Sequence, residues 1–240
     1  SPEYPQAKLL IGDSFFFAKK PSYPEAAVEY QNFLSYFPKH EMRDYALYHI
    51  ALCHFSVITD AERDQVETRQ ALVAFQNLLK EAPASPYATD ARAKITQCWR
   101  RLAESELMVG IFYAKTRHFS GAETRLKGML EAFPEYADRE RAYYYLGVTM
   151  SQRTVDQAQT VQFRKDFLAR LGKDESVTLS KEEQATYKAE FDAYKKAEVA
   201  KYRQEARDDY QRLIESYPKS PWAKRAKHDL DAMGKAAPEA

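Results

Sequence analysis

Histidines, cysteines and neighbouring carboxylates are the residues of this 240-residue sequence that could bind a metal or transfer a proton. The five histidines include no pair at positions i and i+4 around a glutamate, and none forms a ligand cluster with a cysteine. Acidic pairs such as Glu182-Glu183 and Asp208-Asp209 could act as acid and base, but their positions indicate polar, solvated helix faces. We therefore expect no catalytic residue, no bound metal and no cofactor.

The two cysteines, Cys53 and Cys98, each lie fifteen residues after a proline, so they occupy equivalent positions in successive segments. Packed helices lie about 8 to 10 Å apart, whereas a disulfide requires Cα atoms within about 7 Å. We expect both residues to be small, buried side chains without a bridge.

Two runs of three aromatic residues most suggest binding: Phe15, Phe16 and Phe17, then Tyr143, Tyr144 and Tyr145. Three adjacent rings cover about 200° of a helix, more than a buried stripe of about 100° can hold. Some rings must therefore face a neighbouring element or a groove. The candidate residues of a peptide-binding groove are Phe15, Phe16, Phe17, Tyr48, Tyr143 and Tyr144. The alternative interpretation is that these rings fill the space between packed helices.

Composition indicates a helical chain that neither binds nucleic acid nor crosses a membrane. Only 7 glycines occur, and residues that favour helices are abundant. The 36 basic and 35 acidic residues are intermixed, so the clustered positive charge that nucleic acids require is missing. No apolar run approaches the roughly 20 residues that span a bilayer.

A repeat organises the chain. Four segments carry an alanine and a proline twelve residues apart: Ala26–Pro38, Ala71–Pro83, Ala122–Pro134 and Ala206–Pro218. Large apolar residues four and eight positions after each alanine trace one face of a helix. The proline ends that helix because it lacks an amide donor. A further alanine eight residues later begins the next helix, so the pattern predicts repeated helix hairpins.

This pattern resembles the second half of the tetratricopeptide motif, in which a small residue lets paired helices approach and a proline marks the turn. Gly110 and Ala122 match the spacing of that motif. The resemblance implies an all-α fold, a right-handed solenoid of helix hairpins over residues 1–233 with long helices in its C-terminal half. The expected repeats lie near residues 8–38, 42–83, 88–134 and 138–218, followed by a final helix at 221–233.

Several segments depart from the repeat. About fourteen extra residues after Pro83 correspond to about four helical turns and predict one long helix from Ala88 to Thr116. A polar stretch at residues 59–66 is expected to be a surface loop, and residues 234–240 a disordered tail.

The longest departure is a predicted helical insertion at residues 155–205, divided by a turn at 172–180. Ser180 and Glu183 match a capping box, in which the serine accepts a backbone amide and the glutamate returns the bond. The helix that they begin is expected to reach Ser216, which is about 54 Å. A helix of this length must project from the repeats or brace them.

Residues 62–92 and 101–136 resemble a more specific family, the BamD outer-membrane assembly lipoproteins. The resemblance depends on Arg63-Asp64, on the SPYA turn at residues 85–91, on Phe112-Tyr113 at the end of the long helix, and on Arg125. It spans residues 8–150, and the sequence after Gly147 departs from the family.

The resemblance implies a non-catalytic scaffold on the periplasmic face of the bacterial outer membrane. Its partners would be the POTRA region of BamA, other assembly-machine subunits and unfolded outer-membrane proteins. By this resemblance Arg125, Glu123 and Glu131 would contact BamA. Neither Cys53 nor Cys98 matches the family's lipidated cysteine, so we expect the anchor upstream of this sequence.

Two other interpretations remain open. One is a different periplasmic tetratricopeptide adaptor, associated with cell division or peptidoglycan, which the segment at 85–134 disfavours. The other is an enzyme built on a helical solenoid, such as a lytic transglycosylase. The spacing of the repeats leaves no room for the separate catalytic domain that such an enzyme needs.

Overall fold

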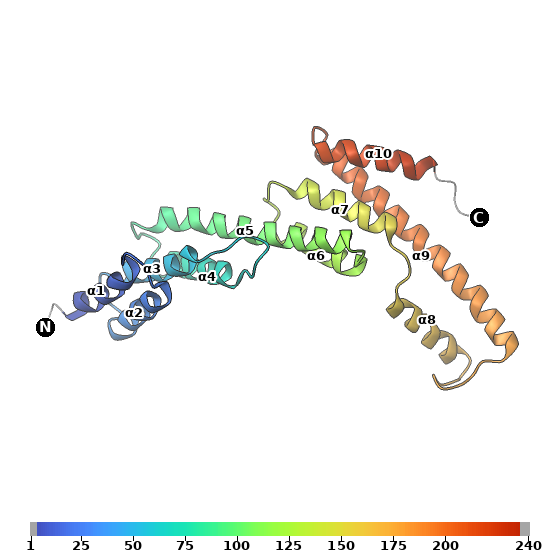
Figure 1. Ribbon diagram of the computed structural model, residues 1–240, viewed down its shortest axis with the longest axis horizontal. Helices are drawn as coiled ribbons and strands as arrows, with labels where there is room; N and C mark the ends of the chain where they lie inside the picture. The colour runs from blue at the N-terminus through green and yellow to red at the C-terminus, as the bar shows by residue number, and fades with distance from the viewer. Residues whose placement is uncertain (1–3, 236–240) are drawn as a thin grey trace. The chain divides into compact units, whose positions relative to one another are not determined.

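The computed structural model describes residues 4–235, and this part of the chain folds into ten α-helices without a β-strand. The chain divides into two compact units, one up to Val109 and one from Gly110 onward. The helices are α1 (Tyr4–Phe16), α2 (Tyr23–Tyr36), α3 (Arg43–Ser56), α4 (Val66–Glu81), α5 (Ala88–Lys115), α6 (Phe119–Ala132), α7 (Arg139–Gln152), α8 (Gln157–Arg170), α9 (Lys181–Ser216) and α10 (Pro221–Lys235), labelled in Figure 1. The all-α prediction is therefore confirmed. The single solenoid and its repeat boundaries stay predictions.

The first unit is a series of helix hairpins in which α1 packs on α2, α2 on α3 and α3 on α4. Tyr30 and Phe33 of α2 are completely buried at the centre of its core. They contact Leu9 of α1 and the small residues Ala46 and Cys53 of α3. The unit is thus built on apolar contacts between consecutive helices.

Four proline turns have the same geometry. The residue before each proline has φ near −130° and ψ near 60°, a conformation that the following ring favours over the helical one. Its amide donates to the carbonyl four residues back, at 2.8 to 3.0 Å, which completes the last turn of the helix. The turns are centred on Phe37, Ala82, Phe133 and Tyr217. The prediction that each aligned proline ends a helix is confirmed.

The small residues of the repeat lie under large ones of the partner helix. A Cβ placed on Gly12 would lie 2.7 Å from a ring carbon of Tyr30, and one placed on Gly110 would lie 2.6 Å from Cδ2 of Leu126. Gly147 has the same relation to the ring of Tyr210. Glycine at these positions lets paired helices approach closely enough to bury the larger side chain.

In the second unit, α7 packs against α6, α9 and α10, and α9 also packs against α10. Tyr210 and Leu213 of α9 form the centre of this core with Ala223 and Ala226 of α10. The polypeptide between α7 and α9 contains α8, which runs beside the N-terminal half of α9 (Figure 1). The long helix α9 therefore belongs to the repeat core at one end and to the insertion at the other.

The insertion has a small core of its own, made by Phe167 and Leu168 of α8 with Leu179 and Tyr187. Gly172 ends α8 with a positive φ of 65°, where a glycine is favoured, and the next amide, that of Lys173, donates to the Leu168 carbonyl at 3.0 Å. The insertion is thus a helix hairpin stabilised independently of the repeat core.

The two long helices lie close to their predicted limits. Helix α9 spans 36 residues and begins with the predicted capping box of Ser180 and Glu183, which is confirmed. Helix α5 ends at Lys115, one residue before the predicted limit. None of the described helices combines the length and apolar character needed to cross a bilayer.

Helix α10 continues through Gly234 to Lys235, the first two residues of the segment predicted to be a disordered tail. Residues 236–240 lie outside the described residues. The cysteine prediction is confirmed, since Cys53 and Cys98 are buried and free. Burial raises the pKa of the Cys98 thiol to about 11, and that of Cys53 to about 12, so both stay protonated.

Candidate protein-interaction surfaces

Aromatic side chains from three segments of the first unit form a connected, partly exposed cluster, here termed the aromatic strip. His49 of α3 is buried at its centre, with its ring centroid 5.2 Å from that of Phe16 and 3.9 Å from that of Tyr45. Tyr48 extends the strip by stacking on the ring of Tyr87, at 4.5 Å and 11° between planes. The strip consists of Phe16, Phe17, Tyr45, Tyr48, His49 and Tyr87.

Carboxylates hold the phenols of this surface in place. Oδ1 of Asp13 accepts hydrogen bonds from Tyr30 and Tyr45, each at 2.7 Å, and Asp90 accepts one from Tyr48 at 2.7 Å. Burial, aided by these bonds, raises the pKa of the Tyr45 and Tyr48 phenols, and burial lowers that of His49. The rings are therefore neutral at neutral pH and fixed in orientation, as suits a preformed contact surface.

The structure places three of the predicted groove residues, Phe16, Phe17 and Tyr48, in the aromatic strip. Phe17 is 65% exposed, which makes it the most accessible ring of the three. Phe15 does not join them, because it lies beside Pro24 and Val28 of α2 in a shallow hollow. Sequence spacing missed His49 and Tyr45, although four residues separate them on one helix face, which is a usable signal.

The predicted groove residues Tyr143 and Tyr144 lie in the second unit and serve its core. Tyr144 donates to Asp229 of α10 at 3.0 Å and packs against Trp222 at 5.1 Å. Tyr143 contacts the core around Tyr210. Both side chains are partly buried, so much of their surface fills the space between packed helices, as the alternative interpretation expects.

The three residues predicted to contact BamA lie on α6 but do not form one patch. Successive residues rotate by about 100°, so Arg125 is about 160° from Glu123 and about 120° from Glu131 around the helix. Arg125 and Glu131 are exposed, whereas Glu123 is partly buried. Arg125 thus lies on an outward face that Glu123 does not share.

Glu123 is instead bound within the chain. Its carboxylate pairs with Lys127 at 2.7 Å and with Arg153, whose guanidinium also lies 4.5 Å above the ring of Tyr202. Burial opposes ionisation of Glu123, but the two cations together hold its pKa below the ordinary value. This ion pair joins α6 to the segment that leads into α8.

A second carboxylate near this pair is less well compensated. Burial raises the pKa of Asp209 on α9 to about 6, against the attraction of Lys127 and Arg212. Glu205 and Asp208 add repulsion that raises it further. In the described residues no group of three histidine, cysteine or acidic side chains is arranged to hold a metal ion.

Helix hairpins with glycine or alanine under large apolar residues, each hairpin ended by a proline turn, define a tetratricopeptide-repeat protein. Residues 193–220 match the tetratricopeptide repeat family. Residues 1–166 match the YfiO family of outer membrane lipoproteins. That match covers more than half of the chain, so this protein belongs to the YfiO family.

Individual relatives have the name expected from the sequence. The chain is 38% identical over 123 residues to the outer membrane protein assembly factor BamD of Caulobacter vibrioides, covering 51% of this chain and 40% of that one. It is 30% identical over 142 residues to BamD of Rickettsia prowazekii, covering 59% of this chain and 56% of that one. It is 31% identical over 127 residues to BamD of Haemophilus influenzae, covering 49% of this chain and 48% of that one. The chain spans about half the length of these relatives, and the predicted resemblance to the BamD family is confirmed.

Proposed function

We propose that this protein is a non-catalytic scaffold in the assembly of outer-membrane β-barrel proteins, acting at the periplasmic face of the outer membrane. The observation that carries this proposal is the family match over residues 1–166, which includes both the aromatic strip and α6. The fold supports it, because stacked helix hairpins provide rigid surfaces on which partners bind.

We propose that BamA docks on the outward face of α6 through Arg125. An arginine can bind a carboxylate through two parallel hydrogen bonds, which gives both orientation and affinity. Glu131 is exposed near the end of the same helix, about 120° around it from Arg125, so we expect it at the edge of this interface and not beside Arg125. Glu123 contributes indirectly, since its pairing with Arg153 fixes the helix that presents Arg125.

We propose that unfolded outer-membrane proteins contact the aromatic strip of the first unit. Exposed Phe17 and the stacked pair of Tyr48 and Tyr87 offer apolar ring faces, and Asp13 and Asp90 fix the tyrosines beside them. An extended client can place large side chains against such rings without a deep pocket.

Titration calorimetry of the chain against the matching BamA periplasmic region tests the docking site. Arg125→Glu should weaken binding about tenfold or more, because it replaces an attraction with a repulsion. Arg164→Glu is a matched control, since it makes the same charge change at an exposed position of α8. Equal loss in both variants, or no binding by a wild-type chain with a normal helical spectrum, would contradict the proposed site.

A further inference from the structure

Basic residues are concentrated in α10 and in the turn before it. Residues 217–235 carry five basic and two acidic residues, whereas the whole chain has a net charge of only +1. The rest of the chain is consequently net negative. The five basic residues of this segment are Lys219, Lys224, Arg225, Lys227 and Lys235.

The cations of α10 lie on its outward side. Ala226 is completely buried in the core of the second unit. Lys224 lies about 160° around the helix from Ala226. Arg225 and Lys227 lie about 100° from it, one on each side. All three basic side chains are exposed, and with exposed Lys219 they form the surface here termed the basic face.

The acidic residues of α10 do little to neutralise this face. Asp229 accepts a hydrogen bond from Tyr144 of α7 at 3.0 Å, so its carboxylate is directed towards the core of the unit. Asp231 is exposed but forms no ion pair with another described residue. The lysines of the basic face likewise have no acidic partner in the part of the chain that the structure describes. They are therefore available to an anionic ligand.

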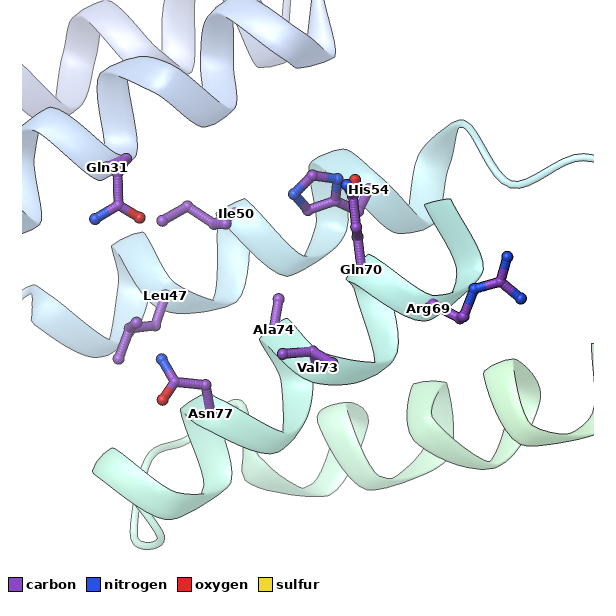
Figure 2. A pocket seen from close by; sticks show the side chains of 9 residues that line it. All are labelled: Gln31, Leu47, Ile50, His54, Arg69, Gln70, Val73, Ala74 and Asn77. Carbon is purple, nitrogen blue, oxygen red and sulfur yellow. The ribbon is translucent and has the colours of Figure 1, made fainter. Parts of the chain in front are cut away.

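The basic residues of the groove between α2 and α4 provide a contrast. This groove of the first unit is lined by an arginine and a histidine among other side chains, as Figure 2 shows. Arg69 lies 3.7 Å from Asp64, and His54 lies 2.8 Å from Glu67. Carboxylates of the chain itself thus balance the positive charge of the groove, which they do not do on the basic face.

The composition of the basic face suits lipid headgroups better than a folded protein. Interfaces with proteins are typically depleted of lysine and have aromatic residues at their centre. The described surface of α10 exposes no large apolar side chain, and its Trp222 packs against Tyr144 of α7. A lysine is a compact, strongly hydrated point charge, which suits phosphate groups that are numerous and not fixed in position.

We propose that the basic face binds the headgroups of anionic phospholipids at a membrane surface. The chain belongs to a family of outer membrane lipoproteins, so a bilayer surface is the anionic partner within reach. Cations close to an anionic bilayer add their attractions, and no side chain needs to enter the hydrocarbon. This inference rests on the location in the proposed function, and not on the docking of BamA or the binding of unfolded proteins.

Co-sedimentation of the chain with lipid vesicles tests the proposal. The chain should bind vesicles of phosphatidylglycerol and should not bind vesicles of phosphatidylcholine, which have no net charge. Raising the salt concentration from about 0.1 M to about 1 M should release it, because salt screens exposed charges. Inorganic phosphate at millimolar concentration should not compete, since one phosphate cannot contact several lysines spread along a helix.

Two double variants locate the binding surface. Lys224→Glu/Lys227→Glu should weaken binding to phosphatidylglycerol about tenfold or more, because it replaces two attractions with repulsions. Lys181→Glu/Lys188→Glu is the matched control, since it makes the same change in charge at two exposed positions of α9. Lys188 lies about 20 Å along α9 from Tyr202, where the end of α10 packs, which exceeds the Debye length of about 10 Å. The control should therefore bind nearly as the wild type does.

Several results would overturn the proposal. One is equal binding to the two kinds of vesicle, or binding to neither. Another is an equal loss in the two double variants, each with a normal helical spectrum by circular dichroism. Binding to poly-glutamate without binding to phosphatidylglycerol vesicles would assign the face to an acidic protein instead. Arg125→Glu should bind vesicles as the wild type does, so a failure here is distinct from a failure of the proposed docking of BamA.

Discussion

The phenolic oxygen of Tyr30 lies 2.7 Å from Oδ1 of Asp13, which joins the buried face of α2 to α1. Tyr45 of α3 donates to the same oxygen, so one carboxylate connects three helices. Burial, reinforced by Asp13, raises the pKa of both phenols and keeps them as neutral donors. This junction lies beneath the aromatic strip and determines how its rings are held.

Removing the shared acceptor should destabilise the first unit. Asp13→Ala leaves two phenols without a partner, and we expect a loss of about 2 to 4 kcal/mol in the free energy of unfolding. Tyr45→Phe removes one donor and leaves Tyr30 bonded, so its cost should be about 1 kcal/mol. Urea denaturation followed by circular dichroism measures both. Equal midpoints for Asp13→Ala and the wild type would show that the junction is not stabilising.

The close contact of Gly147 with Tyr210 makes a second prediction. A Cβ at Gly147 would overlap the Tyr210 ring, so Gly147→Ala should cost about 1 to 3 kcal/mol through overpacking. Gly128→Ala is the matched control, because a Cβ at this position of α6 would meet no atom within 4 Å apart from its chain neighbours and the adjacent helix backbone. It should stabilise by about 0.5 to 1 kcal/mol through helix propensity. Thermal midpoints that shift in the same direction for both variants would refute this explanation.

The repeat predicted the helix hairpins well because their determinants are local. A proline fixes the turn at Phe37 and Tyr217 through its own ring, and a capping box at Ser180 needs only Glu183, three residues away. The contacts of the candidate surfaces are not local. Tyr48 meets Asp90 across 42 residues, and no pattern within one helix indicates such a pairing.

Two further features could not be read from the sequence for the same reason. The pairing of Arg153 with Glu123 crosses 30 residues and removes Glu123 from the outward surface of α6. The loop predicted as a surface segment is partly internal, since Gln65 is buried and donates to the carbonyls of Asp60 and Arg63 at 2.8 and 2.9 Å. Both depend on how separate segments meet in space.

Removal of an aromatic ring from the insertion should loosen the insertion without unfolding the repeats. Phe163 of α8 lies 4.9 Å from Tyr194 and 5.2 Å from Phe191 on α9, away from the core around Tyr210. Phe163→Ala should therefore increase amide hydrogen exchange in residues 157–170 and leave exchange in α10 unchanged. Val161→Ala, at a position that is 47% exposed on the same helix, is the control and should change little. Faster exchange throughout the second unit would contradict an independent hairpin.

The raised pKa of Asp209 leads to a prediction of how the free energy of unfolding depends on pH. Burial raises its pKa to about 6 from an ordinary 3.8, so between these values the folded state binds more protons than the unfolded state. Stability contributed by this group is therefore greatest below pH 4 and is lost as pH rises through 6. Asp209→Asn removes the buried charge and should stabilise the protein at pH 7 by about 1 to 2 kcal/mol, with partial solvent exposure taken into account.

The difference between Asp209→Asn and the wild type should shrink as pH falls from 7 to 4, because the wild-type carboxyl becomes protonated over that range. Urea unfolding at pH 7, 6, 5 and 4 measures it. Glu215→Gln removes a carboxylate charge from an exposed residue of the same helix that does not contribute to the pKa shift of Asp209, and is the matched control. If Asp209→Asn is less stable than the wild type at pH 7, then the attraction of Lys127 and Arg212 outweighs burial, and the carboxylate braces α9 against α6 in its charged form.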